Sequence, residues 1–352
     1  MPRSIPAVIF VALLMVALAL ALWKLAFVLL LAFFGLLLAV LLRHLALALQ
    51  SHSPLSAGAA LGVVVLALLA AIGLGFYFLG AQLAEQLGQL AGSLPGALTK
   101  LRDALEGQPL VQRLREMMPQ EEPGQGLNLF GAVRGTLSTV VNGAANLIVV
   151  AMVAIFLAAD PQLYRRGVLH LIPMDKRARA IEIMDALGQG LWRWLLGQGL
   201  SMMAVAVLTA AGLWMLGIPL WLALGIIAGI ADFIPFIGPW IGAAPAVLLA
   251  FSDGPQTAIY TAILFAVIQQ IEGNILQPII QKRANSLPPV LTVLSVIAFG
   301  VLFGFVGVLV ATPLLLVLMV LVRMIYVEGI LEDPTIEMAE EKARRRDGKA
   351  DA

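Results

Sequence analysis

The sequence contains no cysteine, which excludes disulfide bonds and thiol chemistry. It is also poor in charge, because only 12% of its 352 residues are Asp, Glu, Lys or Arg, whereas soluble domains carry roughly one-quarter. Apolar residues make up 61% of the chain and the mean hydropathy is +0.97. The apolar runs approach the length of membrane helices and lack the short alternation of a membrane barrel. The composition therefore predicts an all-α polytopic membrane protein.

Several motifs of enzymes and pumps are also missing. The sequence has no His-Glu-x-x-His, Walker-type or Gly-x-Ser-x-Gly pattern. Its three histidines, His44, His52 and His170, lie at the ends of apolar runs or in polar segments, without the spacing of metal ligands. We therefore expect no enzyme activity, no metal site and no organic cofactor. We also expect no nucleic-acid partner.

Charge and hydropathy divide the chain into six regions. These are an N-terminal three-span bundle (1–79), an amphipathic extracytoplasmic segment (80–135), a fourth span (136–159), a basic cytoplasmic segment (160–194), a core with two hairpin repeats (195–326) and a charged cytoplasmic tail (327–352). In the first region, two apolar runs at 5–23 and 25–42 are separated by Lys24 alone, which we interpret as a helical hairpin.

The second region, 80–135, differs from the rest because charged residues and prolines interrupt it. Leu83, Leu87 and Leu90 recur at helical spacing. We expect two or three short amphipathic helices, divided by the prolines, that lie on the membrane or on neighbouring subunits. A solvated connector is the alternative.

Residues 216–251 are almost wholly apolar, yet they contain Asp232 and four prolines. An interior proline removes a backbone donor and clashes with the preceding turn, so an uninterrupted helix is not expected. Backbone groups freed in this way at membrane depth must be satisfied within the protein or in a water-filled cavity. We therefore predict a re-entrant helical hairpin, with Asp232, Pro235, Gly238 and Pro239 at its tip.

A second stretch, 289–326, repeats this pattern. It is too long for one helix across a hydrocarbon core of about 30 Å, and it contains Gly300, Gly304, Gly307 and Pro313. We predict that it also folds back, with Gly304 and Gly307 at the tip. Two broken elements in opposite orientations would form an inverted repeat; the alternative is that glycine and proline recur by chance in membrane helices.

The basic residues favour one orientation. If 216–251 returns to its own side of the membrane, most Lys and Arg residues fall on the same side as both termini. Positive charge concentrates on the cytoplasmic side of membrane proteins, so we expect both termini in the cytoplasm.

Asp232 and Glu272 are the only carboxylates deep within apolar sequence. A charge at the bilayer centre costs about 2.5–3.5 kcal/mol even on the lenient insertion scale, so such residues usually face a cavity and serve a function. Polar side chains accompany them at helical spacings: Gln269, Gln270, Asn274 and Gln198, the last on one stripe with Ser201 and Thr209. These residues predict a binding site for a small polar solute or an ion. The alternatives are interhelical hydrogen bonding by the amides and helix capping by Asp232.

Two segments resemble the autoinducer-2 exporter (AI-2E) family of bacterial permeases. They are LGIPLWLALGIIAGIADFIPFIGPWIGAAPAVLLA and QQIEGNILQPIIQKRANSLPPVLTVLSVIAFGVLFGFVGVLVATPLL. The most specific matches are the DFIPFIGP core at 232–239 and the ExNxxxP element at 272–278. The resemblance implies a bacterial inner-membrane protein of about eight membrane helical elements that forms homo-oligomers. It also implies export of autoinducer-2, or sodium/proton antiport as in some members.

Together, these features predict a secondary transporter that moves a small polar solute such as autoinducer-2, with a proton or sodium ion as coupling ion. Glu272 would be the coupling residue, and one hairpin repeat would move against the rest of the protein. A sodium/proton antiporter without an organic substrate is one alternative. An oligomeric channel or a membrane scaffold is another, and either would tolerate the loss of both carboxylates.

Overall fold

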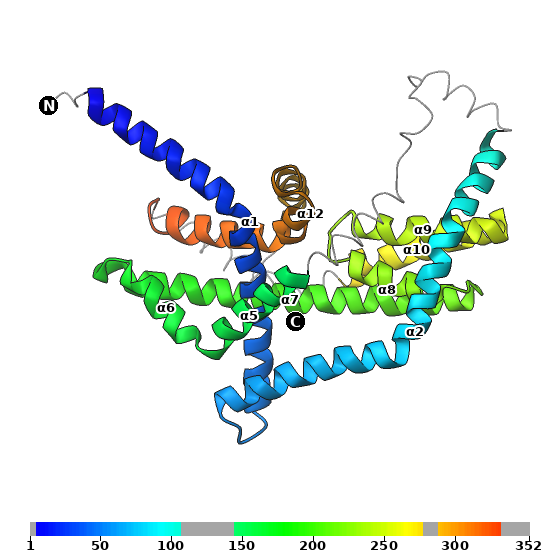
Figure 1. Cartoon of the computed structure of the whole chain (residues 1–352), viewed down its shortest axis with the longest axis horizontal. Helices are drawn as coiled ribbons and strands as arrows, with labels where there is room; N and C mark the ends of the chain where they lie inside the picture. Colours follow the sequence, from blue (N-terminus) through cyan, green and yellow to red (C-terminus); the bar gives the residue numbers. More distant parts are fainter. Residues whose placement is uncertain (1–4, 107–143, 277–287, 332–352) are drawn as a thin grey trace, which may run out of the picture.

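The computed structural model describes residues 5–106, 144–276 and 288–331, which form helices joined by short turns, with no strand among them (Figure 1). The α-helices are α1 (Ile5–Gln50), α2 (Ala57–Glu106), α5 (Ala144–Ala159), α6 (Pro161–His170), α7 (Arg177–Met215), α8 (Trp221–Ala231), α9 (Gly238–Asp253), α10 (Pro255–Ile271) and α12 (Pro289–Leu321). A short 3-10 helix, η1 (Met174–Lys176), precedes α7, and the π-helical turns η2 (Glu272–Leu276) and η3 (Val322–Val327) follow α10 and α12. In these ranges five helices are long and apolar enough to cross a bilayer, or six if the bent pair α5–α6 forms one span. The prediction of an all-α, multi-pass membrane protein is confirmed.

The first helix corrects one prediction. Residues 5–50 form the single helix α1, so the hairpin expected around Lys24 was wrong. No glycine or proline lies between Pro6 and Gly35 to break the helix, and one lysine can extend its amine toward a polar surface without leaving helical geometry. The candidate span within α1 is Lys24–Gln50.

The second helix also continues further than expected. α2 runs through Pro95 to Glu106 without interruption, so this proline does not divide the amphipathic segment. The Ser93 hydroxyl donates to the Gln89 carbonyl at 2.7 Å, and the Thr99 hydroxyl donates to the Pro95 carbonyl at 3.0 Å. Such side-chain bonds occupy carbonyls near the proline and help a helix to tolerate it. The remainder of the segment, 107–135, lies outside the described residues.

The N-terminal part of the fold is a packed group formed by α1, the first half of α2, and α5. Their shared core includes Leu42, Ala46, Ala60 and Ala154. Its members are mostly small, and a β-carbon at Gly35 would lie 2.5 Å from Val153 Cγ1. Apolar burial drives helix association only weakly in lipid, so close approach of this kind carries much of the packing.

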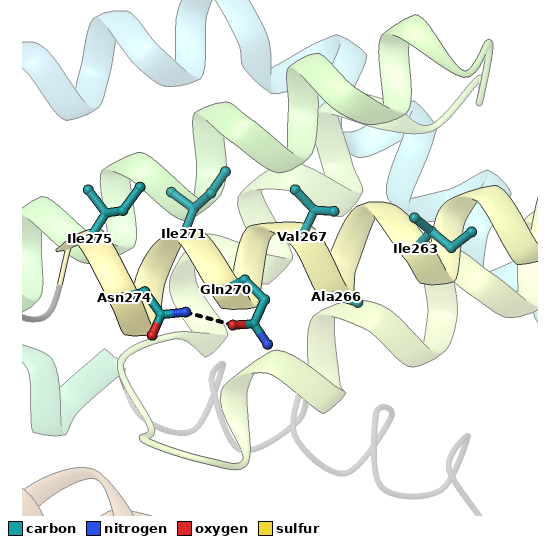
Figure 2. A pocket seen from close by; sticks show the side chains of 7 residues that line it. All are labelled: Ile263, Ala266, Val267, Gln270, Ile271, Asn274 and Ile275. Carbon is teal, nitrogen blue, oxygen red and sulfur yellow. Dashed lines mark hydrogen bonds between the residues drawn. The ribbon is translucent and has the colours of Figure 1, made fainter.

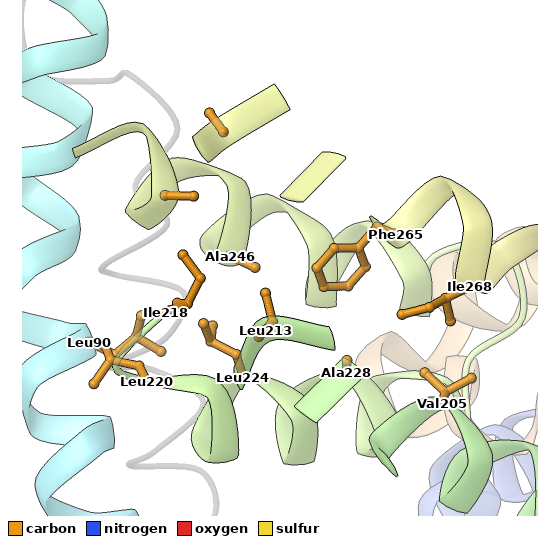
Figure 3. Close-up of a cluster of buried hydrophobic side chains, with 12 residues drawn as sticks. Leu90, Val205, Leu213, Ile218, Leu220, Leu224, Ala228, Ala246, Phe265 and Ile268 are labelled. Atoms are coloured by element: carbon orange, nitrogen blue, oxygen red, sulfur yellow. The ribbon is translucent and has the colours of Figure 1, made fainter. Parts of the chain in front are cut away.

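A second core joins the second half of α2 to α7, α8, α9 and α10. Figure 3 shows Leu90 of α2 on one side of this cluster, with Leu213 of α7, Leu224 of α8, Ala246 of α9 and Phe265 of α10 around it. The amphipathic half of α2 therefore packs on helices of its own chain. The described part of the amphipathic segment, 80–106, thus has packing partners within the chain in addition to those the sequence suggested.

The stretch 216–251 is a helical hairpin, as predicted. α8 ends at Ala231, the chain turns through residues 232–237, and α9 begins at Gly238. The two arms touch closely: a β-carbon at Gly238 would lie 2.1 Å from the Ala231 carbonyl oxygen. Phe236 in the turn has φ of 66°, a left-handed conformation that residues other than glycine adopt rarely.

The last apolar stretch also folds back. Gly304 has φ of 63° and ψ of −147°, which is outside the helical region and divides α12 into two arms. A β-carbon at Gly307 would lie 2.0 Å from the Phe299 carbonyl oxygen, although eight residues of straight helix would separate such positions by about 12 Å. The bend predicted at Gly304 is therefore confirmed.

Ion pairs join the end of this second hairpin to the beginning of α7. Arg179 of α7 pairs with Glu328, which follows η3, and donates to the Met324 carbonyl at 3.0 Å. Arg323 also pairs with Glu328, with 3.0 Å between Nε and Oε1. We refer to Arg179, Arg323 and Glu328 as the α7–η3 ion-pair cluster.

Candidate functional site

Asp232 lies at the break between the two arms of the first hairpin. It follows the last residue of α8, is only 5% exposed, and its Oδ2 atom has no hydrogen-bond partner of standard geometry among the described residues. It does not cap the second arm, because the residue before α9 is Ile237 and no side chain caps that helix. The capping alternative is therefore excluded, and the buried carboxyl group needs another explanation.

Helix α7 brings two polar side chains to this break. Gln198 donates from Nε2 to the Asp232 backbone carbonyl at 2.8 Å. The hydroxyl of Ser201, one helical turn further along α7, is also buried and interacts with the Asp232 carboxyl group. Both residues reach the site because α7 and α8 pack closely: a β-carbon at Gly229 would lie 2.5 Å from Ala206 Cβ.

The second carboxyl group comes from the end of α10. Glu272 begins η2 and interacts electrostatically with the Asp232 carboxyl group. Gln269, one turn earlier, donates from Nε2 to Glu272 Oε2 at 3.0 Å. Short π-helical turns are rare and often occur at functional sites, where they redirect side chains. The structure thus brings together Asp232, Glu272, Gln269, Gln198 and Ser201, which we call the carboxyl-pair site.

Gln270 and Asn274 do not join this site. Asn274 Nδ2 donates to Gln270 Oε1 at 2.6 Å, and both side chains are exposed. Figure 2 shows the bonded pair on one side of α10 and its continuation η2. The pair lies in an open groove of about 420 Å³ that is otherwise lined by Ile263, Ala266, Val267, Ile271 and Ile275. The structure therefore does not bring these two amides to the carboxyl-pair site, because they occupy another face of the helix.

The predicted tip residues lie in the breaks of the two hairpins. Pro235 is in the turn after Asp232, and Gly238 and Pro239 begin α9. Gly304 makes the bend in α12, and Gly307 lies beside the first arm. Phe233, the neighbour of Asp232, packs edge-on against Trp194 of α7 and belongs to an apolar cluster that also contains Leu316 and Val320 of the second hairpin.

One residue near the first hairpin was not singled out from the sequence. Gln86 of α2 is buried, and its Oε1 accepts a hydrogen bond from the Ala223 backbone N–H at 3.0 Å. Ala223 is in the first turn of α8, whose N-terminal flanking residue, Leu220, cannot act as a cap. The signal was present, because Gln86 is a polar residue within the leucine stripe of Leu83, Leu87 and Leu90.

The groups at the carboxyl-pair site are suited to binding an ion or a small polar molecule. Two carboxyl groups, a hydroxyl and two amides can coordinate a proton or a small cation, or form hydrogen bonds to a small polar molecule. Among the described residues, no group of three or more His, Cys, Asp or Glu side chains could hold a metal ion.

Comparison with known protein families matches residues 8–326 to the AI-2E family transporter. The chain belongs to this family. It is similar to the candidate transport protein YrrI of Bacillus subtilis (strain 168), with 29% identity over 68% of each chain. It is also similar to the candidate transport protein YueF of the same organism, with 28% identity over 53% of this chain and 50% of that protein. The match to the candidate permease PerM of Escherichia coli (strain K12) has 27% identity over 64% of this chain and 67% of that protein.

The family match and the apolar helices identify a multi-pass membrane protein of a transporter and permease family. Its relatives carry transport and permease names, which favour transport over catalysis. Each of these matches spans between half and about two-thirds of the relative's length.

Proposed function

We propose that this AI-2E family member is a secondary transporter of a small polar solute such as autoinducer-2, coupled to a proton or sodium gradient. The observation that carries the proposal is the meeting of Asp232 and Glu272 beside the broken helix α8–α9. In the proposed orientation, the protein lies in the bacterial inner membrane with both termini in the cytoplasm.

The physical argument for coupling rests on the two carboxyl groups. Two adjacent negative charges in an apolar environment repel each other strongly, because the low dielectric constant increases their interaction. A proton or a cation bound between them relieves this repulsion. Occupancy of the site therefore follows the ion gradient, and the amides of Gln198 and Gln269 hold the surrounding groups in place.

The fold offers a movable element for alternating access. The first hairpin places Asp232 at its break, whereas Ser201 and Glu272 belong to α7 and η2. A shift of the hairpin relative to α7 would separate or join the two halves of the site. Broken helices that contribute to a binding site in this way are common in secondary transporters.

Transport in proteoliposomes tests the proposal. The purified protein is reconstituted under an imposed pH or sodium gradient, and lumenal pH and the uptake of labelled autoinducer-2 are followed. We expect Asp232→Asn and Glu272→Gln to lower gradient-driven flux about tenfold or more, since a hydrogen bond to a charged group contributes about 1.5–3 kcal/mol.

An exposed carboxyl group away from the site supplies the control for this experiment. Asp253→Asn removes the carboxylate at the end of α9, outside the carboxyl-pair site, and we expect it to leave flux near the wild-type level. Wild-type flux that persists in both carboxyl variants would contradict the proposed site. Solute movement that follows only its own gradient would identify a channel, and absence of any flux would favour a scaffold.

Sodium/proton antiport is the second candidate function, and the carboxyl pair favours it directly. A site that binds either a proton or a sodium ion needs carboxylates and polar oxygens but no organic substrate. In that case, a sodium gradient alone would change lumenal pH, with or without labelled solute. Loss of this signal in Glu272→Gln would support antiport.

We also propose that the protein forms homo-oligomers. The exposed Gln270–Asn274 pair supports this, because amide groups facing lipid are unfavourable and membrane helices commonly pair through such groups. Mass measurement of the detergent-solubilised protein would test the subunit number.

A further inference from the structure

The short helix α6 leaves the membrane part of the fold at a sharp angle. α5 is apolar to its last residue, Ala159, and the chain then bends by 85° into α6. Asp160 sits at the bend and accepts a hydrogen bond from the Leu163 backbone N–H at 3.1 Å, and Pro161 starts the helix. Both features terminate one helix and begin another in a fixed direction. If α5 crosses the bilayer, α6 therefore runs along its surface.

Successive residues of a helix are separated by about 100° around its axis, and this divides α6 into three faces. The first face contains Pro161, Arg165 and Leu169, which are partly buried. It points toward α7, because Arg165 pairs with Asp185 at 2.9 Å. The protein itself therefore covers this face.

The second and third faces are uncovered and differ in chemistry. Four large apolar residues share the second face, which we call the apolar face: Leu163, Tyr164, Val168 and Leu171, which are 61%, 42%, 46% and 86% exposed. The third face, the polar face, contains Gln162, Arg166 and His170, all exposed. A helix with this division is typical of segments that lie in the membrane–water interface.

The position of α6 indicates what covers its apolar face. It follows directly from a helix that packs along α1 and α2, two candidate membrane spans, so it begins where the chain reaches the edge of the apolar layer. Tyr164 is a residue type enriched at this level of membranes. Exposed basic residues also lie here, Arg166 on the polar face and Lys176 in η1, with one acidic residue, Asp175, between α6 and α7.

We propose that α6 is an interfacial helix that binds a bilayer surface containing anionic phospholipids. The apolar face enters the outer part of the acyl chains, and Arg166 and Lys176 contact the negatively charged headgroups. The pairing of Arg165 with Asp185 then connects this lipid contact to α7, the helix that carries Gln198 and Ser201. This proposal does not depend on the transported solute.

Because the chain contains no cysteine, single cysteines can be introduced into the full-length protein without other changes. Leu163→Cys and Val168→Cys report on the apolar face, and the control Gln162→Cys reports on the polar face. Each variant is labelled with an environment-sensitive fluorophore and reconstituted in vesicles of phosphatidylcholine and phosphatidylglycerol. Phospholipids brominated near the headgroup or near the chain end then quench fluorescence according to depth.

We expect shallow bromines to quench the apolar-face labels roughly twofold more than the polar-face label, because interfacial helices bury one side by about 5–10 Å. Chain-end bromines should quench all three labels weakly. Equal and weak quenching at every position would place α6 in water and overturn the proposal. Strong quenching of all three labels by chain-end bromines would show a membrane-inserted helix and would also overturn it.

The choice of lipid is tested in the same vesicles. At equal mole fraction, brominated phosphatidylglycerol should quench the Val168→Cys label more than brominated phosphatidylcholine does. Adding Arg166→Gln and Lys176→Gln should remove this difference, whereas the added control Gln162→Asn should retain it. Equal quenching by both lipids in the parent variant would contradict the selection of anionic headgroups.

Discussion

At the scale of single residues, the first hairpin depends on positions where no side chain fits. Gly238 lies against the Ala231 carbonyl, and Gly242 faces Ala228 across the same pair of arms, where a β-carbon would be 2.8 Å from Ala228 Cβ. These contacts bring the arms together at the point where Asp232 leaves α8. The position of the buried Asp232 carboxyl group therefore depends on glycine at 238 and 242, where a larger residue would push the two arms apart.

We predict that Gly238→Ala destabilises the protein, because its new methyl group would lie 2.1 Å from the Ala231 carbonyl oxygen. Overpacking of this kind typically costs about 1–3 kcal/mol. Thermal unfolding in detergent, followed by fluorescence or by loss of the monodisperse peak, would measure the effect.

The control for this prediction is Gly188→Ala on α7, where nothing lies within 4 Å of an added β-carbon. In a helix, alanine is favoured over glycine by about 1 kcal/mol, so this variant should be as stable as the wild type or more stable. Equal unfolding temperatures for the two variants would contradict the close approach at Gly238.

At the scale of helices, α2 contacts the first hairpin at the beginning of α8 and at the end of α9. Gln86 accepts from the first turn of α8, and the Lys100 amine donates to the Ser252 carbonyl in the last turn of α9 at 3.3 Å. A positive charge at a helix C-terminus is favourable because carbonyls there lack partners. The amphipathic half of α2 thus holds the outer ends of both arms, opposite the break that carries Asp232.

We predict that Gln86→Leu destabilises the first hairpin by about 1–3 kcal/mol, because it leaves the buried Ala223 N–H without its acceptor. Gln86→Glu retains an acceptor oxygen and should recover part of the loss. Hydrogen exchange of the α8 amides, measured by mass spectrometry, would locate the change.

Gln89→Leu is the control for this helix, since the Gln89 side chain is exposed and its amide donates to Glu85 on the same helix. It should leave exchange in α8 unchanged. Faster exchange that was confined to α2 in Gln86→Leu would show that Gln86 stabilises its own helix rather than α8.

The features that the sequence predicted correctly are those with local causes. Several glycines and prolines are concentrated in each of the two apolar stretches, so the breaks near Asp232 and at Gly304 could be foreseen, whereas the single Pro95 leaves α2 continuous. The position of Asp232 and Glu272 within apolar sequence singled them out, and the structure brings the two together; their role as a binding site stays a prediction. The length of α1 was missed because one lysine is a weak interruption, although it looks strong in a hydropathy pattern.

Other features depend on which side of a helix meets a distant neighbour. Gln269 and Gln270 are adjacent in sequence, yet only Gln269 reaches Glu272, because adjacent helical residues point in directions about 100° apart. The partner of Gln86 is 137 residues away. The first relation follows from helical spacing, since residues three apart are neighbours on a helix and residues two apart are not. The second has no local signature and required the three-dimensional structure.

At the scale of the whole molecule, α7 connects the parts described above. Arg179 of the α7–η3 ion-pair cluster lies near the beginning of α7, and Gln198 and Ser201 lie in its middle. Leu213, near the end of α7, belongs to the second apolar core, which also contains residues of α2, α8, α9 and α10. Figure 1 shows it as one long helix across the fold. A displacement of α7 would therefore change the carboxyl-pair site and the ion-pair cluster together.

The ion-pair cluster predicts a pH dependence of stability. Partial burial alone would raise the pKa of Glu328, but the hydrogen bonds and charges of Arg179 and Arg323 outweigh it and lower this pKa below its ordinary value of 4.5. A carboxyl group whose pKa is lower in the folded state stabilises the protein above its unfolded pKa. This contribution is lost as the pH falls through the folded value.

We therefore expect wild type to exceed Glu328→Gln in unfolding free energy at pH 7 by about 0.2–1 kcal/mol, the range of solvent-exposed ion pairs. The difference should shrink as the pH falls below about 4.5. Unfolding temperatures of both proteins between pH 3 and pH 7 provide the measurement. Asp253→Asn, an exposed carboxyl variant outside the cluster, is the control. A constant difference across this pH range would contradict the role of Glu328 ionisation.

The hydrogen bond from Ala223 to Gln86 also has a consequence for biosynthesis. Ribosomes add about 5–20 residues per second, so the 137 residues that separate the two partners take roughly 7–27 seconds to synthesise. α2 has therefore been delivered to the membrane before α8 is made. When the first hairpin is inserted, Gln86, the acceptor for the Ala223 N–H, is already present. A C-terminal fragment translated without α2 would have to insert the same broken helix with the Ala223 N–H lacking this acceptor.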